Sequence, residues 1–118
     1  MMNAREMAIS VADILNARMA HDIVLFDISE MTIIADCFVI CSGRTALQVR
    51  ALYDDLVQKM GQQGISAVRR EGVQDAKWVV VDFGSVVVHI FAQQEREFYS
   101  LERLWGNGTN QIPYTSEQ

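Results

Sequence analysis

The stretch at residues 32–41 constrains the fold most, because it is apolar on both faces of a strand apart from Asp36. A strand of this kind is typical of the centre of a sheet that is covered on both sides. A short polar turn follows, then apolar residues at helical spacing over residues 45–60, and then a new strand pattern from residue 65. A strand, a helix and a strand in this order predict a crossover connection and at least one parallel pair of strands. We therefore expect a mixed sheet with helices packed on it.

The remaining patterns extend this arrangement to the order α-β-β-α-β-β-β-α. Asn3 and Glu6 have the spacing of a capping box in front of a helix predicted over residues 4–20. Phe83 and Gly84 separate two β-branched runs, which predicts a hairpin. The predicted strands are residues 23–28, 32–41, 65–69, 78–82 and 85–91, with a loop at residues 70–77 and a short final helix at residues 95–105. The predicted fold class is α/β, in detail an α+β mixed sheet.

Length and composition predict one folded domain. The chain has 118 residues, of which 50% are hydrophobic, and this suits a single domain with a core of its own. Gly, Asn, Thr, Pro and Ser dominate from residue 106 onward, a composition typical of a disordered terminus. We expect a single domain over residues 1–106 and a disordered tail over residues 107–118.

The charge balance disfavours some partners and favours others. Ten Lys and Arg against fifteen Asp and Glu give a net charge of −5, and the basic residues form no cluster. Duplex nucleic acids need several cations to neutralise their phosphates, so we expect no direct sequence-specific nucleic-acid binding, and basic partners instead. The sequence has neither a secretion signal at its start nor an apolar run long enough for a membrane span, and we expect a cytoplasmic protein.

Cys37 and Cys41 raise the question of a disulfide or a metal site. Four residues apart in one strand, they would share a face about 13 Å apart, which is too far to bridge. Zinc usually takes three or four ligands, and neither a second cysteine pair nor a pair of closely spaced histidines accompanies them. We expect two reduced cysteines in a strand and no metal site.

Enzymatic patterns are incomplete. A turn at Ser42 and Gly43 between a strand and a helix could present amides to a phosphate, but the glycine-rich phosphate-binding sequences are absent. A nucleotidyltransferase needs two or three carboxylates for two Mg²⁺ ions, and the strand that ends at Asp82 offers one. Asp54 and Asp55 are adjacent within a helix and would point apart. We expect no cofactor, no catalytic residue and no enzymatic activity.

Three residues of the predicted hairpin, Asp82, His89 and Trp78, allow a functional interpretation. Asp82 and His89 lie on adjacent strands, where they could form an acid–base pair, but no nucleophile is positioned beside them. Trp78 opens a strand directly after a polar loop. It could be an interface hot spot or could anchor the core beneath that loop, and the sequence favours neither.

Five blocks of the sequence resemble one known family, the ribosomal silencing factor family RsfS, also called Iojap. The blocks occur in the family's order and spacing, and the resemblance covers about residues 5–106. They are residues 34–43, 48–51, 78–84, 86–89 and 99–105.

The resemblance implies a nucleotidyltransferase-like fold without that activity. It also implies binding to the large ribosomal subunit through its fourteenth protein, which lies on the subunit-joining face. There the bound factor would block the small subunit and lower translation under starvation, and family members are expected to form homodimers.

The family motif places the expected contact at Trp78, Asp82 and Phe83. Trp78 would supply apolar burial, and Asp82 would supply a carboxylate for an Arg or Lys of the partner. The expected polar rim is Glu71, Asp75 and Lys77. Two alternatives stay open: a metal-dependent nucleotidyltransferase, and a homodimeric structural module without a ribosomal role.

Overall fold

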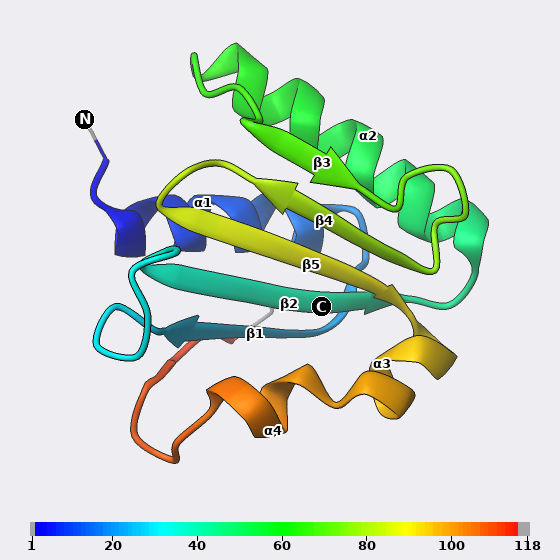
Figure 1. The fold of residues 1–118 in the computed structure, drawn as a ribbon. Coiled ribbons are helices and arrows are strands. Elements are labelled where there is room, and N and C mark those ends of the chain that lie inside the picture. Colours follow the sequence, from blue (N-terminus) through cyan, green and yellow to red (C-terminus); the bar gives the residue numbers. More distant parts are fainter. Residues whose placement is uncertain (1, 116–118) are drawn as a thin grey trace.

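The structure is a computed structural model that describes residues 2–115, apart from the side chains of residues 98 and 99. Within this range the strands form one six-stranded sheet in the order β3-β4-β5-β2-β1-β6 (Figure 1). β2 and β5 are parallel, and the other neighbouring pairs are antiparallel. The predicted mixed sheet with a parallel pair is therefore confirmed. The strands are β1 (His21–Asp27), β2 (Cys37–Gly43), β3 (Arg69–Glu71), β4 (Trp78–Asp82), β5 (Val86–Ala92) and β6 (Gln111–Ile112).

Two longer helices and two shorter ones pack around this sheet. α1 (Ala4–Ala17) and α2 (Ala46–Gln62) cover one face, and α3 (Gln93–Tyr99) and α4 (Leu101–Trp105) lie along the β1 side of the sheet (Figure 1). The predicted capping box is confirmed, because Asn3 and Glu6 each accept a hydrogen bond from the other's backbone N–H. None of the described helices is long and apolar enough to cross a bilayer.

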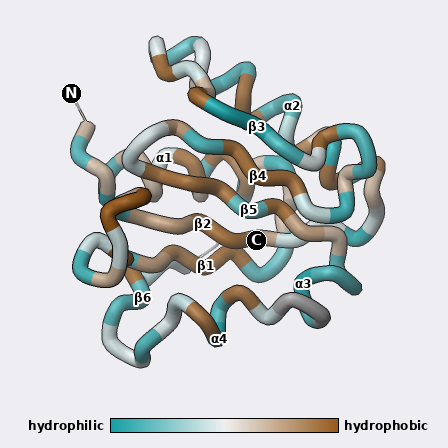
Figure 2. The backbone as a smooth tube through the Cα atoms, viewed as in Figure 1, coloured by the Kyte–Doolittle hydropathy of each residue, from teal (hydrophilic) through white to brown (hydrophobic). Residues whose placement is uncertain are grey.

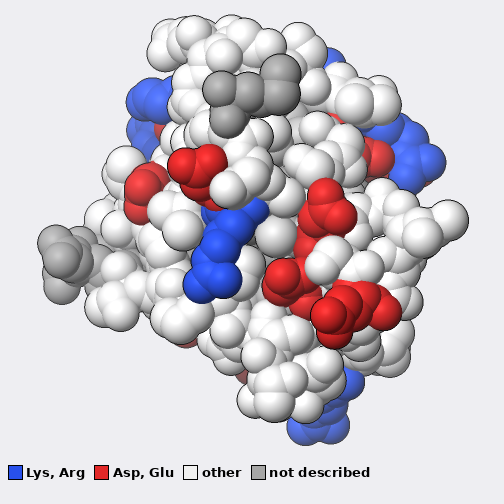
Figure 3. All heavy atoms as spheres, turned by 90° about the vertical axis from the view of Figure 1, so that its left-hand side faces the viewer, with Lys and Arg blue, Asp and Glu red and all other residues white. Residues whose placement is uncertain are grey.

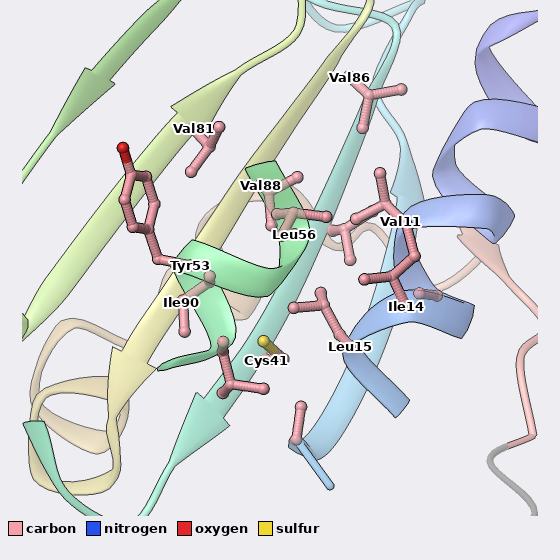
Figure 4. Close-up of a cluster of buried hydrophobic side chains, with 14 of the residues drawn as sticks. Val11, Ile14, Leu15, Cys41, Tyr53, Leu56, Val81, Val86, Val88 and Ile90 are labelled. Carbon is pink, nitrogen blue, oxygen red and sulfur yellow. The ribbon is translucent and has the colours of Figure 1, made fainter. Parts of the chain in front are cut away.

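The larger core fills the space between the sheet and the helices α1 and α2. Figure 4 shows Leu15 of α1 and Leu56 of α2 directed toward Val88 and Ile90 of β5. Every residue of β2 is buried, and β2 lies between β1 and β5. The predicted position of this strand at the centre of a covered sheet is therefore confirmed, because both of its apolar faces have a layer to pack against.

β2 and β3 differ most from their predicted bounds, and β1 begins two residues earlier and ends one residue earlier than predicted. β2 begins at Cys37 rather than at residue 32, because Ile33 and Ile34 are exposed in the preceding loop although they continue the apolar pattern. The strand predicted at residues 65–69 is β3, which covers Arg69–Glu71 and takes residues from the predicted loop. All three residues of β3 are exposed. It is a strand because its backbone pairs with β4, and its side chains carry no apolar signal.

The C-terminal part also differs from the prediction. The single helix predicted over residues 95–105 is divided by Ser100, whose φ of 48° belongs to the left-handed region, so α3 and α4 are separate. Two other elements were predicted closely. β4 has the predicted bounds, and β5 is shifted by one residue at each end.

The predicted disorder of residues 107–118 is wrong for residues 107–115. β6 pairs with β1, and Ile112 of β6 is buried against the main core. The Asn110 side chain donates to the carbonyl of Asp27 at 3.0 Å, and the Tyr114 hydroxyl donates to Asp13 at 2.8 Å. The polar composition predicts disorder, whereas these polar groups make tertiary hydrogen bonds. Residues 116–118 lie outside the described residues.

Candidate functional site

The sheet face opposite α1 and α2 is covered only in part. Along β4, Val79 and Val81 are buried toward the helices, whereas Trp78, Val80 and Asp82 point to the other face and are half-buried. Opposite residues of an antiparallel pair share a face, which adds the two residues of β3 that pair with Asp82 and Val80. We call this set the open face: Arg69, Glu71, Trp78, Val80 and Asp82. Figure 2 shows the hydrophilic β3 beside the more hydrophobic β4 and β5.

Trp78 lies at the loop end of the open face, where β4 begins. Its ring stacks on Phe91 of β5 with the ring centroids 5.0 Å apart and the planes inclined by 23°. The loop before β4 turns tightly at Gly72, which has a φ of 77° and where a Cβ atom would lie 2.1 Å from the carbonyl oxygen of Trp78. Only glycine fits such an approach, so the loop fixes the backbone that carries the tryptophan.

Asp82 and Phe83 are adjacent but lie in different environments. The Asp82 carboxylate accepts a hydrogen bond from the backbone N–H of Gly84 at 2.7 Å and so closes the turn of the hairpin. Asp82 stays half-exposed at the end of the open face. The Phe83 side chain is 6% exposed and belongs to the core on the helix side. Of this pair, only Asp82 offers a side chain to a partner.

The three residues predicted as a polar rim are all exposed, but they are not on one surface. Glu71 lies on β3 opposite Val80 and belongs to the open face. Asp75 and Lys77 lie in the loop that precedes β4. Lys77 lines a hollow of about 440 Å³ between this loop and the start of α3. The open face therefore unites Glu71, Trp78 and Asp82, while Asp75 and Lys77 flank its Trp78 end.

Sequence reasoning missed His89 as a partner of Trp78. The indole Nε1–H of Trp78 donates a hydrogen bond to Nδ1 of His89 at 3.1 Å. His89 is 7% exposed, and burial lowers its pKa to about 4, so the ring is neutral at physiological pH. Its position at i+11 from Trp78 gives no local signal, because only the hairpin register brings the two together. Val80 could have been found from the two-residue period of β4.

Two other pairs of side chains, Asp82 with His89 and Cys37 with Cys41, form no joint site in the structure. Asp82 lies opposite Val87 and His89 lies opposite Val80, and each has a different hydrogen-bond partner, so they form no acid–base pair. Cys37 and Cys41 are both free and buried in β2 on the core side. Burial raises the pKa of the Cys41 thiol to about 12, which keeps it protonated.

The adjacent carboxylates of α2, Asp54 and Asp55, point apart, as the sequence predicts. Asp54 is exposed, whereas Asp55 is buried beside Arg18 and Lys59, each 3.5 Å from its carboxylate. Across residues 2–115, no three His, Cys, Asp or Glu side chains gather in a way that could hold a metal ion.

The whole chain matches the model of one protein family. That family is described as "Ribosomal silencing factor during starvation", and the match covers residues 1–118. The chain belongs to the ribosomal silencing factor family. The sequence-based recognition of RsfS is therefore confirmed, and it extends through the C-terminal tail that the five blocks left out.

Individual members of the ribosomal silencing factor family agree with this assignment. The ribosomal silencing factor of Bacillus subtilis is 37% identical over 106 residues, which is 90% of each chain. The chloroplastic protein Iojap of Zea mays is 30% identical over 112 residues, covering 94% of this chain and 49% of the maize protein. A crystal structure of a Chromobacterium violaceum protein superposes with a TM-score of 0.87 at 28% identity, over 99% of this chain and 98% of the other. The fold is thus shared with this solved structure over almost the full length of both chains.

Proposed function

We propose that this chain binds the large ribosomal subunit through the subunit's fourteenth protein and sterically blocks the small subunit, which lowers translation during starvation. The proposal combines the family assignment with the open face. A half-exposed tryptophan beside an aliphatic residue, with carboxylates at the margin, is the composition of a protein-binding hot spot. The protein would act by occupying a surface and would catalyse no reaction.

Charge supports a basic partner. The chain has a net charge of −5, and Figure 3 shows acidic side chains gathered on the face at the left-hand side of Figure 1. Asp82 and Glu71 contribute two carboxylates to the open face itself. A carboxylate at the margin of an apolar contact can pair with an Arg or Lys and orient the partner before the tryptophan is buried.

Three further features belong to this proposal. We propose a homodimer, as the family resemblance implies. We also propose that the protein acts in the cytoplasm. The mixed sheet is proposed to be of the nucleotidyltransferase-like type, used here as a binding scaffold.

The observation that carries the proposal is the exposure of Trp78 on the open face, and Trp78→Ala tests it. We expect a loss of affinity for isolated large subunits of about 30-fold or more, the cost of removing a tryptophan hot spot. The measurement is co-sedimentation with isolated large subunits over a range of protein concentrations. Circular dichroism and a thermal melt of Trp78→Ala check that the fold survives the loss of stacking on Phe91.

Leu47→Ala is the matched control. Leu47 is 76% exposed on α2, on the opposite side of the sheet, so its truncation removes exposed apolar surface without touching the open face. The control should bind large subunits like the wild type. If folded Trp78→Ala also binds like the wild type, the contact does not lie on the open face.

A further inference from the structure

His89 is a titratable side chain that is buried in the sheet. It lies in the middle of β5, and its ring is surrounded by aromatic rings on the same face of the sheet. Phe38 packs on it in a T-shaped arrangement at a centroid distance of 4.8 Å, and the ring centroids of Phe91 and Trp78 lie 6.3 and 6.1 Å away. The ring is 7% exposed, and within the described residues its Nε2 atom has no hydrogen-bond partner.

The hydrogen bond from Trp78 fixes the state of this ring. An indole N–H can only donate, so Nδ1 of His89 must carry its lone pair and the proton must lie on Nε2. Burial among aromatic rings keeps the imidazole neutral. Nδ1 of His89 is therefore a hydrogen-bond acceptor at physiological pH, and it faces the only polar atom of the Trp78 side chain.

The hydrogen bond to this acceptor selects one orientation of the Trp78 ring, which stacking alone does not do. Stacking on Phe91 restricts the plane of the Trp78 ring but does not choose between its two edges, since the outer torsion of tryptophan has broad alternative wells. A directional hydrogen bond to Nδ1 selects the orientation that turns Nε1 toward β5. This hydrogen bond therefore fixes the orientation in which the indole ring stands on the open face.

Core packing alone does not account for a histidine at this position. A buried polar atom without a partner costs stability, and an apolar ring of similar size would avoid that cost. A residue that lowers stability in a folded core is expected where it serves a function.

We infer that His89 is a positioning residue for the contact surface: it holds the Trp78 indole in one orientation, so that a partner need not order this ring on binding. The inference rests on the proposed function, because it concerns the presentation of Trp78 to the large subunit. Ordering a flexible side chain on binding weakens association, and a preordered one avoids this loss.

The test compares His89→Phe, His89→Leu and His89→Asn. Phe and Leu remove the acceptor and keep the site apolar, whereas the Asn side-chain oxygen can take the place of Nδ1 as acceptor. We expect His89→Phe and His89→Leu to bind isolated large subunits about 2- to 10-fold more weakly, with folded states at least as resistant to urea as the wild type. His89→Asn should recover most of the affinity.

A spectroscopic measurement separates positioning from a merely structural role. The indole N–H proton resonance of Trp78 should move upfield in His89→Phe, because its hydrogen bond is lost, and should move back in His89→Asn. The resonance of Trp105 serves as an internal reference. In a Trp78→Phe background, His89→Phe should cause no further loss of affinity, because the donor is already absent.

The outcomes distinguish this inference from the proposed function. If Trp78→Ala weakens binding while His89→Phe shifts the indole resonance and binds like the wild type, the positioning role is wrong and the contact stands. If Trp78→Ala binds like the wild type, the contact is wrong and the positioning role falls with it. If His89→Phe fails to fold, the pair His89→Leu and His89→Asn gives the same comparison.

Discussion

At the scale of the single residue, His89 links stability to pH. Its pKa is about 4 in the folded protein because burial disfavours the charged ring, against 6.5 when solvated. Between these values the unfolded chain binds the proton and the folded chain does not. The free energy of unfolding therefore decreases as the pH falls from 6.5 toward 4. Above pH 6.5 the ring is neutral in both states, and His89 then causes no loss of stability.

This linkage predicts a specific difference between the wild type and His89→Phe. By pH 5 the wild type should have lost on the order of 2 kcal/mol of stability through His89 alone, and the variant should lack this loss. Urea unfolding at pH 7, 6 and 5 measures it, as a gap between the two proteins that changes with pH. Parallel curves for the two proteins would show that His89 titrates normally and is not shielded from water.

At the scale of the element, we expect the short strand β6 to contribute to the stability of the fold. It has two residues, yet it pairs with β1, and Ile112 is 3% exposed against the main core. Ile112→Ala should lower the free energy of unfolding by about 2 kcal/mol, the lower end of the range for a buried isoleucine, since β6 lies at the edge of the sheet. The shift of the urea midpoint measures this.

Ile33→Ala provides the same chemical change at a fully exposed position. It should change the free energy of unfolding by less than about 0.5 kcal/mol. If Ile112→Ala is as mild as Ile33→Ala, the C-terminal strand contributes nothing to the core.

At the scale of the whole molecule, the proposed mechanism is steric occupation, and this predicts stoichiometry. Joined ribosomes should decrease in proportion to the fraction of large subunits that carry the protein, and excess small subunits should restore them. An enzyme would act at a small fraction of the subunit concentration. Sucrose-gradient profiles at protein-to-subunit ratios below and above one measure this, and strong inhibition far below a ratio of one would contradict steric blocking.

The sequence predicted the elements whose signals are local. Helical spacing with a capping box predicted α1 at Asn3, and β-branched runs around Phe83 and Gly84 predicted the β4–β5 hairpin. Trp78 and Asp82 were also predicted as site residues, and they do lie together on the open face. Their role in binding stays a prediction. The family motif also places Phe83 at the contact, but the strand's alternation ends there and its side chain enters the core.

The amino-acid sequence by itself determined the central strand, the mixed sheet and the family, because these depend on apolar periodicity and on the order of motifs along the chain. Only the tertiary structure decided the rest. β3 is a strand because β4 offers it a backbone to pair with, and β6 is ordered because β1 and the core lie beside it. His89 meets Trp78 because the hairpin register sets them on one face. Contacts between residues distant in the chain leave no local pattern, since each partner supplies only half of the interaction.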